Sequence, residues 1–195
     1  MKKILPIIKL ATQLATVERA LGYRAGHLEN DAEHSYQLAL CCWSANEQYD
    51  LGLDNELIFK IAIAHDLVEV YAGDTDAMGD PKEIALKEKK EEEAFTRLKE
   101  EYREFKDLLN TIERYESKQD EEAKLVYVVD KLIPDVNVYN GKGTYYKDKK
   151  LTCEDWKKWF FGKVDYEGLS PKLQSFVDES IHIIETEFIT NFYEA

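Results

Sequence analysis

The stretch IAIAHDLVEVYAGD, from Ile61 to Asp74, places a histidine and an aspartate side by side within an apolar run. Apolar residues there recur with the spacing of one helix face, so we predict a buried helix that begins near Asp54 and ends at Gly73. Burying an ionisable pair without a partner carries a large free-energy cost. The sequence therefore predicts that His65 and Asp66 have a partner that offsets this cost, and a metal ion would be such a partner.

Helical spacing recurs along the whole 195-residue chain, whereas the sustained alternation of apolar and polar residues that indicates strands is nearly absent. We predict an all-α fold and, from the length, a single domain over residues 1–195. Pro134 should bend or interrupt its helix, and Ser170 should cap the last helix, with Pro171 as the first helical residue. The remaining predicted helices run from Asn30 or Asp31 to Tyr49, from Pro81 to Tyr102, from Phe105 to Tyr115, from Asp120 to Tyr139, around Trp156 to Phe161, and from Ser170 toward Tyr193.

The composition is that of a soluble globular protein, with 44% hydrophobic and 33% charged residues. Lys and Arg total 26 against 39 Asp and Glu, a net charge of -13, so a nucleic-acid backbone would be repelled. No apolar segment approaches the roughly 18 to 20 residues that span a bilayer. We therefore expect a cytoplasmic protein with neither nucleic acid nor membrane as a partner, and we assign its cysteines to packing.

Two further ionisable residues interrupt apolar patterns. His34 lies near the start of the predicted helix DAEHSYQLAL, and Asp130 lies inside LVYVVDKLI among large aliphatic residues. With His65 and Asp66, they supply two imidazoles and two carboxylates, which can converge on one divalent cation and leave positions open for water or a phosphate oxygen. Taken singly, His34 could be a surface residue of a first helical turn, and Asp130 could bond Lys131 or a backbone group.

Two more carboxylates accompany the histidine and aspartate pair. Glu69 lies four residues after His65 and thus on the same helix face, and Asp74 follows Gly73, where the chain is free to fold back. Both are candidates for orienting or deprotonating a water activated by the metal. Alternatively, Glu69 is a hydrogen-bond partner of a metal-binding histidine, and Asp74 caps a helix.

The segments EHS at residues 33–35, AHDLVEVYAGD at 64–74 and VVDKL at 128–132 together resemble the HD-domain phosphohydrolase superfamily. Within that superfamily, the sequence is most similar to the bacterial 5′-deoxynucleotidases and their eukaryotic relatives. The resemblance covers about residues 19–140 and implies a helical HD-type bundle. Additional C-terminal helices at about 150–195 match nothing recognisable.

The resemblance implies a role for each candidate residue. One divalent metal ion, whether Mn, Co, Fe, Mg or Zn, would be held by His34, His65, Asp66 and Asp130, and the acid/base and water-orienting carboxylates would be Glu69 and Asp74. Arg19 lies at the position of a phosphate-binding arginine, and Arg24 at that of a second arginine. Those nucleotidases carry an aromatic residue directly after the first arginine. This chain has Ala20 there, which leaves the sugar preference open.

The function implied by these residues is the metal-dependent removal of the 5′-phosphate from nucleoside monophosphates, with deoxynucleoside monophosphates as the expected class. A first alternative is hydrolysis of a nucleoside triphosphate or a guanosine polyphosphate on the same metal. A second is a nucleotide-sensing module without catalysis. The expected partner is a small-molecule nucleotide, and the resemblance also allows for a homodimer.

Overall fold

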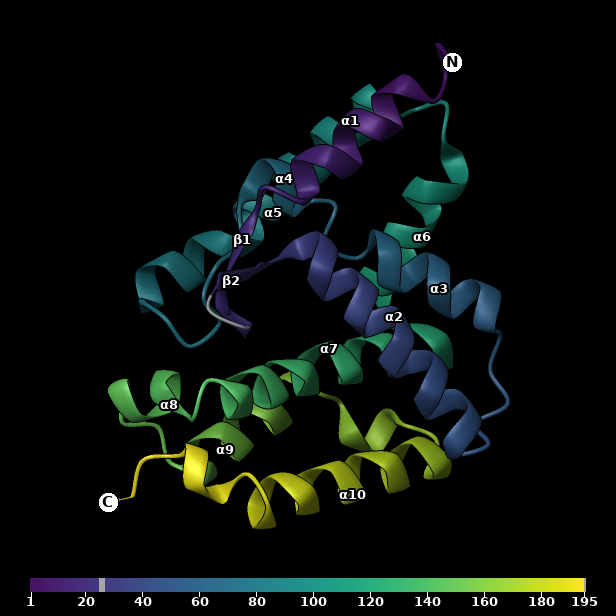
Figure 1. Cartoon of the computed structure of the whole chain (residues 1–195). Coiled ribbons are helices and arrows are strands. Elements are labelled where there is room, and N and C mark those ends of the chain that lie inside the picture. Colours follow the sequence, from purple (N-terminus) through teal and green to yellow (C-terminus); the bar gives the residue numbers. More distant parts are fainter. Residues whose placement is uncertain (25–26, 195) are drawn as a thin grey trace.

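The computed structural model describes residues 1–24 and 27–194, except for the side chains of residues 21–24, 27 and 81. Helices dominate it, which confirms the predicted all-α class (Figure 1). No helix among the described residues is long and apolar enough to cross a membrane. The elements are α1 (Leu5–Leu14), β1 (Glu18–Arg24), β2 (His27–Asn30), α2 (Asp31–Gln48), α3 (Asn55–Ala64), α4 (Glu69–Ala72), α5 (Pro81–Glu101), α6 (Lys106–Ser117), α7 (Glu121–Asn140), α8 (Thr144–Asp148), α9 (Cys153–Lys163), α10 (Pro171–Thr186), and the 3-10 turns η1 (Tyr166–Gly168) and η2 (Ile189–Asn191).

Helix α2 begins where the sequence predicts, because Asn30 and Glu33 form a capping box. The Asn30 side chain accepts hydrogen bonds from the backbone N–H groups of Ala32 and Glu33, at 3.1 and 3.0 Å. In return, Glu33 Oε2 accepts the backbone N–H of Asn30 at 3.2 Å. Such a box satisfies N–H groups that have no partner within the helix. It fixes the first turn of α2, which carries His34.

The single helix predicted from Asp54 to Gly73 is wrong, because the chain turns at the histidine and aspartate pair. Helix α3 ends at Ala64, residues 65–68 form a turn, and α4 follows. Inside the turn, the N–H of Glu69 donates to the carbonyl of Asp66, three residues back, at 2.9 Å. In an α-helix it would donate to the carbonyl four residues back, so the chain here is wound more tightly than an α-helix. Gly73 ends α4 with a φ of 74°, a conformation that favours glycine.

The hairpin of β1 and β2 contradicts the expectation that residues 18–30 contain no strands. The two strands pair antiparallel, with Glu18 opposite Asn30 and Tyr23 opposite Leu28, and the register is irregular between these pairs. The backbone N–H of Asp31 continues the pairing by donating to the carbonyl of Val17 at 3.1 Å. Because β1 also packs against α7, the hairpin brings its first residues next to the middle of that helix.

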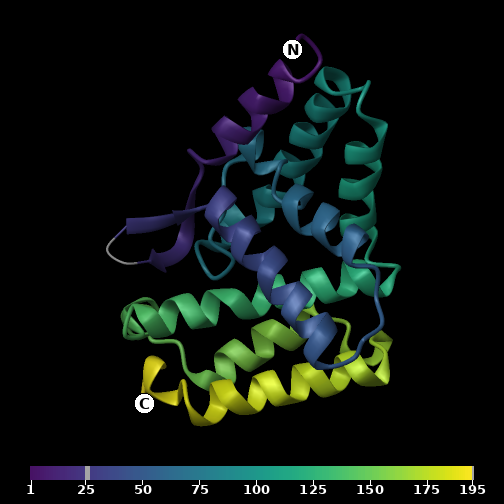
Figure 2. The same cartoon turned by 45° about the vertical axis from the view of Figure 1, so that its right-hand side comes forward.

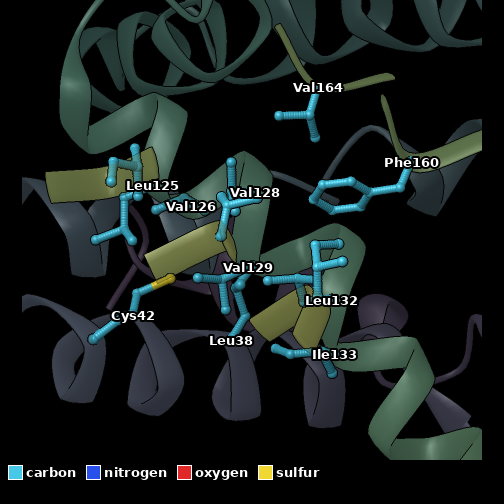
Figure 3. Close-up of a cluster of buried hydrophobic side chains, with 14 of the residues drawn as sticks. Leu38, Cys42, Leu125, Val126, Val128, Val129, Leu132, Ile133, Phe160 and Val164 are labelled. Atoms are coloured by element: carbon cyan, nitrogen blue, oxygen red, sulfur yellow. The ribbon is translucent and has the colours of Figure 1, made fainter. Parts of the chain in front are cut away.

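Helix α7 organises the larger apolar core, between α2 on one side and α10 on the other (Figures 1 and 2). In the cluster shown in Figure 3, α2 contributes Leu38 and Cys42, α7 contributes Val129 and Leu132, and α9 contributes Phe160. The sequence predicts that Pro134 bends or interrupts its helix, and of these two outcomes the interruption does not occur, because α7 continues through Pro134 to Asn140. Asp130, the predicted metal ligand on α7, thus lies within one continuous helix.

A second apolar cluster joins α1, α5 and α6, with Leu10, Leu98 and Ile112 among its fully buried members. Ala64 and Leu67 belong to this cluster, whereas Ile61 belongs to the larger core. The turn at residues 65–68 therefore lies where the two clusters meet.

Helix α10 begins at Pro171 as predicted, but the Ser170 side chain makes no capping hydrogen bond, and the helix ends at Thr186 rather than near Tyr193.

Candidate metal centre

Three elements bring the four predicted metal ligands together. His34 comes from the first turn of α2, His65 and Asp66 come from the turn after α3, and Asp130 comes from the middle of α7. His34 Nε2 lies 2.9 Å from Asp130 Oδ1, and His65 Nε2 lies 2.9 Å from Asp66 Oδ2 and 3.8 Å from Asp130 Oδ1. His34, His65 and Asp66 each offer one ligand atom, and these three atoms lie within 4.8 Å of one another. Both imidazoles are fully buried.

The hydrogen bonding of His65 fits a metal ligand. Its Nδ1 lies 3.0 Å from the carbonyl oxygen of Ala62, so Nδ1 carries the proton and donates it to that oxygen. With Nδ1 as the donor, Nε2 is the nitrogen that a metal ion would bind, and it faces Asp66 Oδ2 at 2.9 Å. Nε2 makes no hydrogen bond within the described part of the chain. Burial would lower the pKa of His65, but the charge of Asp66 raises it, so a positive charge is favoured between Nε2 and Oδ2, and a metal ion held there would supply it.

The other ligand pair is held by its own partners. Burial, and then the charge on Arg19, lowers the pKa of His34 to about 4, so its imidazole is neutral near pH 7 and can offer a lone pair. Asp130 Oδ2 accepts a hydrogen bond from the Tyr115 hydroxyl at 3.0 Å and one from Lys131 Nζ at 2.5 Å. Burial alone would raise the pKa of Asp130, but Lys131 and then His34 keep it well below its usual range. Oδ2 is thereby occupied, and Oδ1 faces the histidines.

The bond between Asp130 and Lys131 is the one that the sequence offered as an alternative to metal binding. In the structure Asp130 makes this bond through Oδ2 while its Oδ1 faces the His34 imidazole, so the bond to Lys131 leaves Oδ1 for a metal ion.

Arg19 lies against the same carboxylates. Its Nη1 is 2.8 Å from Asp66 Oδ2 and 3.3 Å from Asp31 Oδ1, and its Nη2 is 4.0 Å from Asp130 Oδ1. Only 12% of the side chain is exposed. The structure therefore brings Arg19 to the predicted site, whereas the side chain of Arg24 lies outside the described residues.

The two predicted catalytic carboxylates border the metal ligands. Glu69 is buried, its Oε1 lies 3.7 Å from Lys87 Nζ, and its Oε2 has no hydrogen-bond partner within the described residues. Burial, and then the charges of Asp66 and Asp74, raises the pKa of Glu69 well above its usual value. Asp74 Oδ2 accepts the backbone N–H of Ala20 at 2.6 Å, which ties the loop after α4 to the hairpin.

Sequence reasoning missed three residues of this site: Asp31, Tyr115 and Lys87. Asp31 is fully buried. Asp31, Asp66 and Glu69 each offer one carboxylate oxygen, and these three oxygens lie within 4.8 Å of one another. Burial, and then Asp66, raises the pKa of Asp31 to about 7. Its position three residues before His34, on the same helix face, was a usable signal. Nothing in the local sequence around Tyr115 or Lys87 points to this site.

A cavity of about 300 Å³ opens beside these groups. Its lining near the metal ligands includes Arg19, His65, Asp66, Glu69, Asp74 and Asp130. The cavity thus adjoins a cluster of carboxylates and histidines with an arginine in its midst, an arrangement suited to holding a cation and an anion side by side.

The chain is similar to several known proteins. The HD domain family model matches residues 11–163. The 5′-deoxynucleotidase HDDC2 of Danio rerio is 30% identical over 139 residues, which cover 68% of this chain. The matching region spans 66% of that relative, slightly less than two thirds of its length.

Two solved structures share the fold. A predicted metal-dependent phosphohydrolase from Magnetospirillum magnetotacticum MS-1 has a TM-score of 0.75 and 22% identity, with 99% of this chain and 95% of that chain covered. A conserved hypothetical protein from Pyrococcus furiosus has a TM-score of 0.63 and 23% identity, with 91% of this chain and 99% of that chain covered.

Proposed function

Since the chain belongs to the HD-domain family, we propose that it is a metal-dependent phosphohydrolase that removes the 5′-phosphate from nucleoside monophosphates, with deoxynucleoside monophosphates as the preferred class. The observation that carries the proposal is the convergence of two buried imidazoles on two carboxylates, with His34 Nε2 2.9 Å from Asp130 Oδ1 and His65 Nε2 2.9 Å from Asp66 Oδ2. The proposed metal ligands are His34, His65, Asp66 and Asp130, the proposed catalytic carboxylates are Glu69 and Asp74, and the proposed phosphate-binding residues are Arg19 and Arg24.

A divalent ion held by these four residues would supply Lewis acidity toward a phosphate oxygen and would lower the pKa of a nearby water molecule. The protein's own groups do the rest. Arg19 carries a fixed positive charge, and Asp31 and Asp66 hold its Nη1 at 3.3 and 2.8 Å, so its planar fork is oriented before a phosphate arrives. Such a preorganised charge stabilises the negative charge on phosphorus oxygens.

Glu69 is the proposed base. Its Oε2 is buried beside the cavity without a hydrogen-bond partner in the described chain, and the raised pKa of this carboxyl makes its ionised form a strong acceptor for a proton of the attacking water. Asp74 is anchored by the N–H of Ala20 and has the proposed role of orienting that water. The leaving group is the 5′-oxygen of the nucleoside.

One observation favours a second candidate, a substrate with more than one phosphate. The cavity lining also includes four lysines, Lys87, Lys118, Lys131 and Lys163, which would suit a longer anion. Most of these ammonium groups already have acidic or backbone partners, for example Lys87 with Glu91 at 3.3 Å, so the monophosphate remains the leading proposal.

The test uses protein stripped of metal with a chelator and then supplied with Mn, Co, Fe, Mg or Zn singly. Mono-, di- and triphosphates of one nucleoside are added, and phosphate and nucleoside are measured. We expect nucleoside and phosphate in equal amounts from the monophosphate only after a metal is restored. Asp66→Ala should lose both metal and activity, whereas Asp148→Ala, an exposed carboxylate on α8, should keep both.

Three outcomes contradict the proposal. Phosphate release by the stripped protein would remove the metal from the reaction. Consumption of triphosphate with monophosphate untouched would identify a polyphosphate hydrolase. Nucleotide binding without turnover at any metal would identify a sensing module.

A further inference from the structure

Trp159 is the aromatic residue of α9 that lines the cavity. Its neighbours on this helix are engaged with other rings, since Trp156 stacks on Phe160 with centroids 5.4 Å apart and Phe161 lies 5.8 Å from Tyr166. The indole of Trp159 makes no ring contact of this kind within residues 1–24 and 27–194; it is partly buried, with one side packed against the larger apolar core and its Nε1 buried. The part of the indole that lines the cavity is the part that a ligand there can contact.

The cavity connects the metal centre to a wall formed by α7 and α9. That wall carries Tyr127, Pro134, Trp159 and Lys163. A volume of about 300 Å³ is at the lower end of the range of small-molecule pockets. Since residues of α5 and α6 also line the cavity, this wall is one of the surfaces that face the nucleoside part of a nucleotide whose phosphate lies at the metal centre.

The two aromatic residues of the wall are not equivalent. The ring of Tyr127 faces the ammonium groups of Lys118 and Lys131, which lie 4.6 and 4.8 Å from its centroid. A cation over an aromatic face occupies the surface that a stacked base would need. Trp159 has no such cation among the described residues, so it offers the freer aromatic surface. Lys163, four residues further along α9, lies on the same helix face and supplies a donor beside it.

We propose that Trp159 is a specificity-determining residue that stacks on the base of the nucleotide, an inference that rests on the proposed function. Every base has an aromatic face, so stacking of this kind tolerates different bases. The enzyme accordingly accepts several nucleobases but discriminates against sugar phosphates, which carry the same phosphate ester without a base.

The test compares Trp159→Ala and Trp159→Phe with the wild type on thymidine 5′-monophosphate and on 2-deoxyribose 5-phosphate. Stacking contributes about 1–3 kcal/mol per base, and 1.4 kcal/mol is a factor of ten. Trp159→Ala should therefore raise KM for the nucleotide roughly 5- to 140-fold, with KM for the sugar phosphate changed less than about twofold. Trp159→Phe should keep most of the nucleotide affinity. Trp43→Ala, on an exposed part of α2, is the matched control and should behave as the wild type.

A second readout does not depend on turnover. Thymidine titrated into the protein should quench tryptophan fluorescence in the wild type and in Trp43→Phe, and this quenching should disappear in Trp159→Phe. Equal losses on both substrates in Trp159→Ala, or quenching that survives in Trp159→Phe, would overturn the assignment. If the wild type hydrolyses neither substrate, the proposed function fails, and the quenching experiment still decides the role of Trp159.

Discussion

Replacing Tyr115 with phenylalanine removes one hydroxyl group from the buried surroundings of Asp130. That carboxylate is only 4% exposed, and its Oδ2 accepts from the Tyr115 hydroxyl at 3.0 Å and from Lys131 Nζ at 2.5 Å. A hydrogen bond to a charged group contributes about 1.5–3 kcal/mol. Because Lys131 remains as a second donor in Tyr115→Phe, the lower part of this range applies. We expect the free energy of unfolding to fall by about 1.5–2 kcal/mol.

The measurement is urea unfolding of the metal-free protein, followed by circular dichroism, with an unchanged slope and a lower midpoint. In a parallel metal titration, Tyr115→Phe should bind the metal about 10- to 100-fold more weakly, because groups that hydrogen-bond to metal ligands orient them. The matched control is Tyr127→Phe, since the Tyr127 hydroxyl makes no hydrogen bond within the described residues. The reasoning is refuted if Tyr115→Phe is as stable as Tyr127→Phe and binds metal as tightly.

Three further predictions concern other buried carboxylates. Asp31→Ala removes one of the two short contacts that orient Arg19, so steady-state kinetics should show KM for the nucleotide raised about tenfold with little change in kcat. Glu69→Gln removes the proposed base, so kcat should fall about 10²- to 10⁴-fold while metal analysis finds the metal retained. Burial raises the pKa of Asp135 well above its value in the unfolded chain, about 3.9, so wild-type stability should decrease as pH rises from about 4 toward the folded-state pKa. Asp135→Asn should lack this decrease and unfold at higher urea than the wild type at pH 8.

Each of these has a contrary result. A fall in kcat with unchanged KM in Asp31→Ala would show that Asp31 does not act through phosphate binding. Full activity of Glu69→Gln would exclude Glu69 as the base. Parallel stability curves for the wild type and Asp135→Asn between pH 4 and 8 would mean that Asp135 is ionised in the folded protein.

The metal-ligand candidates were readable from the sequence because each is an ionisable residue in a run that is otherwise apolar. His65, Asp66 and Asp130 carry this signal most clearly, and the structure brings all three to one place together with His34. Tyr115 carries no such signal, because a tyrosine on a helix face has the pattern of an ordinary core residue. Only the folded structure shows that its hydroxyl donates to Asp130. Its contribution depends on tertiary packing alone.

Backbone details near the site were less predictable. The break after Ala64 could not be predicted from the spacing of apolar residues, because a tight turn of four residues changes that spacing very little. The hairpin at residues 18–30 shows no regular alternation, and its irregular register explains why. The capping box at Asn30, by contrast, is a local pattern and could be predicted from neighbouring residues.

The most direct test of the metal centre is anomalous X-ray diffraction from crystals grown with Zn²⁺. Coordination of the predicted kind places a single anomalous peak about 2.0–2.2 Å from a nitrogen of His34 and of His65 and from an oxygen of Asp66 and of Asp130. A peak bound elsewhere, or enzymatically active crystals with no peak among these four side chains, would contradict the account.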